Sequence, residues 1–154
     1  MKILMYLAKN FSFRPFEKTL PAVAQPAEEV LYGQTGGLST PAAPEEEVQV
    51  EQAVVIFVHC EPQDEAGPAG LETKFVKNVK WIAGKRGFKN VVLHSFTHLA
   101  EASASPQFAE TFLQSAAARL GSTGYLVTLT PFGWTCEWKL SVYGESLAKV
   151  FKSL

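Results

Sequence analysis

The chain has 154 residues, of which 47% are hydrophobic and 19% are charged, and its net charge is −1. This length predicts one domain with a single core, and the small net charge argues against a broad, general nucleic-acid-binding surface. No apolar run approaches the roughly 18 residues that span a bilayer. The two cysteines form no CxxC motif, so we expect no disulfide framework and a cytoplasmic location.

The N-terminal third predicts two strands followed by a long insertion. Residues 2–8 are apolar enough for a buried strand, Asn10 predicts a turn, and residues 11–16 alternate as in a half-buried strand. Residues 21–50 are rich in Pro, Ala, Gly and Glu, which predicts a loop or insertion within the domain. We expect residues 33–47 of this insertion to be poorly ordered.

Two amphipathic helices are predicted, over residues 71–85 and 106–120, and we expect them to cover one face of the sheet. Glycines end both helices, and Ser105 is a good N-cap for the second. Residues 71–90 carry six Lys or Arg residues and one acidic residue, Glu72. This pattern indicates either a local basic face or the solvated side of a helix.

The rest of the sequence predicts four more strands and a short helix at the C-terminus. The strands are expected over residues 53–58, 91–93 and 125–130, and a further strand with one wet face starts at Trp138. Residues 146–154 can form the helix. The alternation of strands and helices predicts an α/β fold with a mixed sheet and helices packed on it.

Polar or titratable residues follow three of the predicted strands. They are His59–Glu61, Ser95–His98 and Pro131–Cys136. Because ligands of α/β proteins bind beside strand ends, we expect these three segments to converge on one pocket.

Two motifs resemble the archaeal-type editing domain of threonyl-tRNA synthetase, whose fold is that of the D-aminoacyl-tRNA deacylases. They are Phe-x-His-Leu, at Phe96–Leu99, and Pro-Phe-Gly-aromatic, at Pro131–Trp134. The resemblance covers most of residues 53–149 and the first strand, whereas residues 21–50 match nothing. It implies hydrolysis of a mischarged aminoacyl-tRNA ester, serine on threonine tRNA, with the 3′ end of charged tRNA as partner and a homodimeric assembly.

The resemblance also implies roles for particular residues. His98 matches the histidine of the first motif, whereas Cys136 stands where the family has a lysine, and Lys149 where it has an acidic residue. We predict His98 and Cys136 as catalytic residues. The predicted substrate-binding residues are His59, Cys60, Glu61, Phe96, Pro131, Phe132, Gly133 and Trp134.

Several alternatives remain open from the sequence. His98 can bind a loop carbonyl, Cys136 can be a small buried residue, and the aromatic residues can belong to the core. A zinc site or other cofactor is not expected. Besides the deacylase, two functions are possible: a non-catalytic module that binds a tRNA 3′ end or a nucleotide, and a thiol-dependent hydrolase that uses Cys136.

Overall fold

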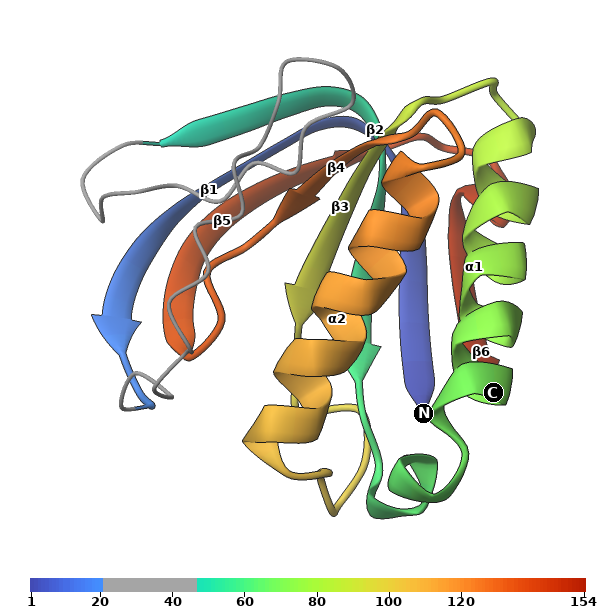
Figure 1. The fold of residues 1–154 in the computed structure, drawn as a ribbon. Coiled ribbons are helices and arrows are strands. Elements are labelled where there is room, and N and C mark those ends of the chain that lie inside the picture. Colours follow the sequence, from blue (N-terminus) through green and yellow to red (C-terminus); the bar gives the residue numbers. More distant parts are fainter. Residues whose placement is uncertain (21–46) are drawn as a thin grey trace.

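The computed structural model describes residues 1–20 and 47–154, which form a six-stranded mixed sheet with two long helices (Figure 1). The predicted α/β class is thereby confirmed. The elements follow one another as β1 (Lys2–Lys18), β2 (Val48–His59), the 3-10 helix η1 (Pro62–Ala66), α1 (Pro68–Gly84), β3 (Asn90–Ser95), α2 (Pro106–Gly121), β4 (Leu126–Leu129), β5 (Trp134–Val142), the 3-10 helix η2 (Ser146–Ala148) and β6 (Lys149–Ser153).

The sheet combines a parallel part and an antiparallel part. The strand order is β4-β3-β2-β1-β5, and β6 also pairs with β1. The pairs β2–β3 and β3–β4 are parallel, whereas β1 runs antiparallel to β2, β5 and β6. The parallel strands β2 and β3 therefore end at the same edge of the sheet, which is where the candidate site lies.

Both helices lie on one face of the sheet (Figure 1). The apolar stripe of each helix faces the sheet, and Phe75 of α1 meets Phe112 of α2 edge to face at 5.5 Å. Ser105 caps α2 by accepting a hydrogen bond from the Phe108 amide at 3.3 Å, and Pro106 occupies the first turn. The predicted position of the helices on one face is thus correct.

The predicted turn at Asn10 is wrong, because β1 is a single long strand. Its register with β5 shifts between Ala8 and Asn10, which marks a bulge. The bulge changes which alternate residues face the helices: Met5 packs beneath them, whereas Phe11 packs in the second cluster on the opposite face. Gln52 of β2, beside this bulge, has a positive φ of 47°.

The predicted C-terminal helix is also wrong. Residues 149–153 form β6, which pairs with residues 2–6 of β1, and the Leu154 amide donates to the Met1 carbonyl at 2.9 Å. The first half of β1 has no other neighbour on that side, since β5 pairs with the second half. A free strand edge of this kind binds an extended segment in preference to a short, isolated helix.

Part of the predicted insertion at residues 21–50 belongs to the sheet, since β2 already begins at Val48. The expectation that residues 33–47 are poorly ordered falls outside the described residues, apart from Glu47. Within the described ranges, no helix is long and apolar enough to cross a membrane.

Candidate active site

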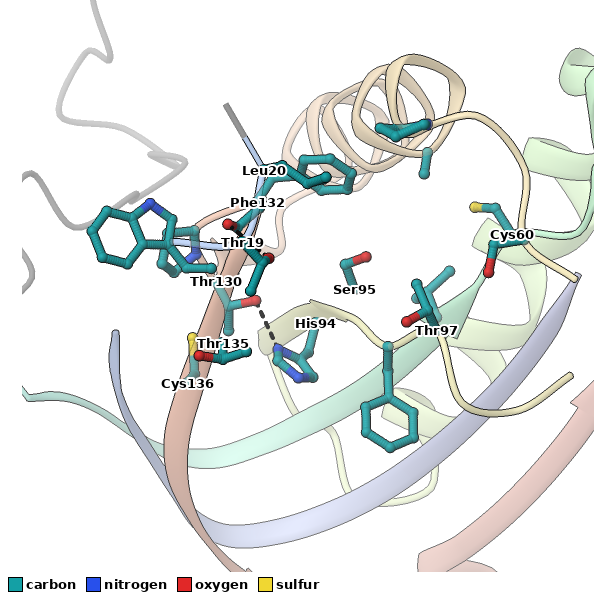
Figure 2. Close-up of a pocket in the computed structure, with 18 of the residues that line it drawn as sticks. Thr19, Leu20, Cys60, His94, Ser95, Thr97, Thr130, Phe132, Thr135 and Cys136 are labelled. Carbon is teal, nitrogen blue, oxygen red and sulfur yellow. Dashed lines mark hydrogen bonds between the residues drawn. The ribbon is translucent and has the colours of Figure 1, made fainter. Parts of the chain in front are cut away.

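A pocket of about 410 Å³ opens where β3 and β4 end and β5 begins (Figure 2). Leu20 and Phe132 lie on one side of it and Cys60 on the other, with Ser95 between them. Two of the three predicted segments, Ser95–His98 and Pro131–Cys136, supply about half of the lining residues. The remaining lining residues are Thr19, Leu20, Val58, Cys60, His94, Ser103, Ala104, Pro106, Ala109, Thr130 and Trp138.

The segment after β3 offers the pocket several free polar groups. Ser95 is half-buried and Thr97 is exposed, and within the described part of the chain neither hydroxyl has a hydrogen-bond partner. His98 is exposed, and its ring meets Phe96 edge to face at 5.2 Å. These three side chains are therefore available to hydrogen-bond a ligand or a water molecule.

A buried pair, His94 and Thr130, joins the two strand ends under the pocket. The Nδ1 atom of His94 lies 2.9 Å from the Thr130 hydroxyl, and the ring packs against Phe57 and Phe96. Burial lowers the pKa of His94 from 6.5 to about 4. The imidazole is therefore neutral at pH 7, and the pair fixes β3 relative to the loop that follows β4.

The Pro131–Gly133 loop has a conformation that requires its glycine. Gly133 has a φ of 76°, and a Cβ atom there would lie 3.1 Å from the Leu20 Cβ. Its carbonyl accepts hydrogen bonds from the amides of Thr19 and Leu20 at 2.8 and 3.1 Å. The motif thus ties the end of β1 to the pocket and brings Thr19 and Leu20 into the wall.

The pocket wall contains no Lys, Arg, Asp or Glu among the residues that the structure describes. Burial raises the pKa of the Cys60 thiol to about 12, with a further contribution from Asp64. Burial also raises the pKa of Cys136. Both thiols are therefore protonated at pH 7 and are poor nucleophiles.

Two predicted substrate-binding residues, His59 and Glu61, lie outside the pocket wall. His59 is fully buried, accepts from the Leu99 amide at 3.2 Å through Nδ1, and lies 2.9 Å from the Ala102 carbonyl through Nε2. With both nitrogens occupied, His59 holds the loop that carries His98. Cys60 is the one member of the predicted segment His59–Glu61 that lines the pocket.

Glu61 belongs to an ionic clamp, which we define as Glu61, Asp64 and the N-terminal ammonium of Met1. The buried ammonium donates to Glu61 at 2.8 Å and to Asp64 at 2.7 Å. The Asp64 carboxylate also accepts from the Glu61 amide at 2.7 Å. The hydrogen bond from the ammonium lowers the pKa of Glu61, so this carboxylate is ionised and engaged in structure.

Lys149 does not line the pocket. It begins β6 and pairs with Tyr6, whereas Cys136 pairs with Pro15, much farther along β1. Lys149 and Cys136 therefore lie beside well-separated positions along β1. The described residues include no group of three or more His, Cys, Asp or Glu side chains placed to hold a metal ion.

Several lining residues were not predicted from the sequence. Thr19 and Leu20 come from the end of β1 and reach the pocket only through the Gly133 carbonyl, so no local pattern reveals them. Ser95 and Thr97 belong to the predicted segment Ser95–His98, although neither was given a role of its own, and Thr130 lies beside the segment Pro131–Cys136. Their hydroxyls at strand ends were an available signal.

The fold is that of the D-aminoacyl-tRNA deacylases, as predicted. It is similar to the solved structure of the c-Myc DNA unwinding element binding protein, with a TM-score of 0.63 and 12% identity over 100% of this chain and 99% of that one. At this identity the likeness defines the fold alone.

The amino-acid sequence shows the family to which this chain belongs. Residues 1–154 match the archaea-specific editing domain of threonyl-tRNA synthetase, and the chain belongs to that family. Over 100% of its own length, this chain is 27% identical to the threonine–tRNA ligase of Methanopyrus kandleri. Over 99% of its own length, it is 28% identical to the threonine–tRNA ligase of Hyperthermus butylicus. It spans 22% and 23% of these two relatives, respectively.

Proposed function

We propose that the pocket hydrolyses the ester bond of a mischarged aminoacyl-tRNA, with serine on threonine tRNA as the substrate that family membership favours. The observation that carries the proposal is the meeting of both family motifs in one pocket. Phe96 and His98 lie on one part of its wall, and Pro131, Phe132 and Gly133 lie on another. The cavity is of a size that binds a small ligand, in keeping with the terminal aminoacyl-adenosine.

The pocket chemistry suits an ester that is already reactive. Hydrolysis needs a positioned water molecule and donors for the oxyanion that develops on the carbonyl. The free hydroxyls of Ser95 and Thr97 and the ring of His98 supply polar groups on one wall. The 2′-hydroxyl of the terminal adenosine supplies a further donor from the substrate itself.

In this mechanism His98 positions or transfers a proton, and Cys136 acts as a wall residue. The raised pKa of the Cys136 thiol argues against a thiolate nucleophile. One observation supports a second candidate, the non-catalytic module that binds a tRNA 3′ end: no cationic side chain of the described residues lines the pocket. The resemblance implies a lysine where this chain has Cys136.

The wider assignments are part of the same proposal. The partner is the 3′ end of a charged tRNA, the assembly is a homodimer, and the location is the cytoplasm, where aminoacyl-tRNAs are used. The parent activity of the full-length relatives, ligation of threonine to tRNA, is not attributed to this chain.

The test is a hydrolysis assay on a panel of charged tRNAs, namely seryl-, threonyl- and D-aminoacyl-tRNA. We expect faster hydrolysis of seryl-tRNA than of threonyl-tRNA, and a strong loss of rate when the terminal adenosine lacks its 2′-hydroxyl. No hydrolysis of any member, together with measurable binding of the uncharged 3′ end, would instead support the binding module.

A further inference from the structure

The outer side of α1 carries a row of exposed cations with a tryptophan among them. Lys74, Lys77, Trp81 and Lys85 follow one another at spacings of three, four and four residues, so they lie on one side of the helix. Lys152 of β6 joins them, since its Nζ lies 5.7 Å from the Trp81 ring. We call these five residues the lysine stripe.

Within the part of the chain that the structure describes, no acidic side chain forms an ion pair with the lysine stripe. Five of the chain's cationic side chains form ion pairs within the described residues, and none of these five belongs to the stripe. Glu72 is the acidic residue of α1, and it is bound by Arg119 and Ser115 of α2. The stripe therefore presents a local positive potential on a chain whose net charge is −1.

The Trp81 ring lies close to the ammonium groups of two lysines, Lys85 and Lys152, which are distant from each other in the sequence. The Nζ of Lys85 lies 5.2 Å from its ring centre and that of Lys152 lies 5.7 Å away. The indole is 41% exposed. Cation–π attraction holds each lysine on the ring, but two like charges at one ring also repel each other. An anion between them would relieve that repulsion.

The pocket and the lysine stripe differ in charge: the described pocket wall has no charged side chain, whereas the stripe is cationic. A tRNA is a polyanion, and most of the affinity for such a ligand comes from Lys and Arg contacts to phosphates. The pocket wall supplies no such contact among the described residues, and no residue of the stripe lines the pocket. The 3′ end and the body of an RNA thus have separate surfaces on which to bind.

The two surfaces are connected through the chain. Cys60 of the pocket wall is followed by η1 and then by α1. From Lys74 to Lys85 the stripe extends for about 16 Å along the helix, at 1.5 Å per residue. A nucleic-acid duplex carries one charge per roughly 1.7 Å of its axis, so this length spans several phosphates.

We propose that the lysine stripe binds the phosphate backbone of the tRNA whose 3′ end enters the pocket. The identity of this RNA rests on the proposed function, whereas the stripe's preference for a phosphate backbone rests on its own charges. Lys85 and Lys152 on Trp81 form its strongest anion site, and the remaining lysines extend it along α1.

The test measures binding of uncharged threonine tRNA by fluorescence anisotropy, as a function of salt, for two variants that each lose two charges. One is Lys77→Gln/Lys85→Gln, in the stripe. The control is Lys9→Gln/Lys139→Gln, at exposed positions outside it. The stripe variant should lose about 10- to 100-fold in affinity near 0.1 M salt, and its slope of log K against log salt should fall by about 2.

The control variant should bind tRNA like the wild type. Equal losses in both variants, no loss in the stripe variant, or no binding of tRNA by the wild type would each overturn the proposal. So would an acidic polypeptide that binds the stripe while tRNA binding is unaffected.

A second readout separates this proposal from the proposed function. Hydrolysis of seryl-adenosine, which has no RNA body, should be equal in the stripe variant and the wild type. A wild type that binds tRNA through the stripe but hydrolyses neither seryl-adenosine nor seryl-tRNA would refute the deacylase and leave the stripe supported. A stripe variant that binds tRNA normally refutes the stripe, whatever the hydrolysis.

Discussion

The parallel strands β2 and β3 are neighbours that end at the same edge of the sheet, and a histidine lies at or just beyond each end, in a different environment. His59, at the end of β2, is fully buried and has both ring nitrogens engaged. His98, after β3, is exposed, contacts Phe96 and lines the pocket. The segment at the end of β2 is thus a scaffold, whereas the segment after β3 has free polar groups for chemistry.

The difference arises from what lies next to each segment. The segment after β2 meets the buried ammonium of Met1, and Glu61 and Asp64 pair with it. The segment after β3 meets the loop of Gly133, which contributes apolar walls and leaves the hydroxyls of Ser95 and Thr97 free. Polar residues at a strand end therefore form a site only where their hydrogen-bonding capacity remains unused.

Replacing His98, in the segment after β3, should have the largest effect on the deacylation rate and little effect on stability. We expect His98→Ala to slow deacylation of seryl-tRNA by about 10- to 10⁴-fold, the range for a group that positions or transfers a proton. Because the side chain is exposed, the free energy of unfolding should change by less than about 0.5 kcal/mol. Single-turnover kinetics and denaturant unfolding measure the two quantities, and an unchanged rate would remove His98 from the mechanism.

Breaking the ionic clamp should lower the stability of the protein and leave the deacylation rate nearly unchanged. We expect Asp64→Asn to lower the free energy of unfolding by about 3 kcal/mol, because it leaves the buried Met1 ammonium short of one carboxylate. The single-turnover rate of the folded fraction should stay within about twofold of the wild type, since Asp64 does not line the pocket. A large loss of rate with unchanged stability would place the clamp in the active site.

Acid should destabilise the protein through His94, which lies beneath the pocket. Its folded pKa of about 4 is below the 6.5 of an unperturbed histidine, so the unfolded state binds the proton more tightly. The stability that depends on neutral His94 is complete above pH 6.5 and is lost as pH falls towards 4. Between pH 7.5 and pH 5 we expect a loss of about 2 kcal/mol.

The His94→Phe variant tests this assignment by denaturant unfolding at both pH values. It removes the titrating group and keeps a ring of similar size against Phe57 and Phe96. Its stability should vary less with pH than that of the wild type, by about 2 kcal/mol. His98→Ala serves as the control and should keep the full pH dependence. An undiminished dependence in His94→Phe would show that another group is responsible.

Of these substitutions in the pocket wall, Cys136→Ser should have the smallest effect on the deacylation rate. We expect Cys136→Ser to change the deacylation rate by less than about twofold, because the thiol is protonated and serves as part of the wall. Cys136→Lys, which places a cation in a pocket wall that has none among the described residues, should raise the rate. An inactive serine variant, or an acyl-thioester trapped on the wild type and detected by mass spectrometry, would move the protein to the thiol class.

The two helices and the parallel strands could be predicted from the sequence, and the two family motifs could be found in it, because each of these features is encoded locally. The apolar stripes of α1 and α2, the Ser105 cap and the continuous apolar runs of β2 and β3 are all short-range patterns. The Phe-x-His-Leu and Pro-Phe-Gly motifs follow β3 and β4, and they converge because these two strands are parallel neighbours in the sheet.

The features that the sequence did not predict depend on partners distant in the chain. Residues 149–153 form a strand because the first half of β1 offers a free edge, and Thr19 joins the pocket because the Gly133 carbonyl binds its amide. Glu61 resembled a pocket residue until its partner proved to be the Met1 ammonium. Such long-range pairings leave no periodic signal.

If an aminoacyl-tRNA ester is hydrolysed in this pocket, filling the pocket should abolish the reaction. Ala109 of α2 lines the pocket, whereas Ala118 lies on the exposed side of the same helix. The measurement is the single-turnover rate of seryl-tRNA hydrolysis at saturating protein for the wild type, Ala109→Trp and Ala118→Trp. This location of the chemistry predicts a wild-type rate for Ala118→Trp and a rate close to that of buffer for a folded Ala109→Trp. A folded Ala109→Trp protein that hydrolyses seryl-tRNA as fast as the wild type, or a wild type no faster than buffer, would contradict it.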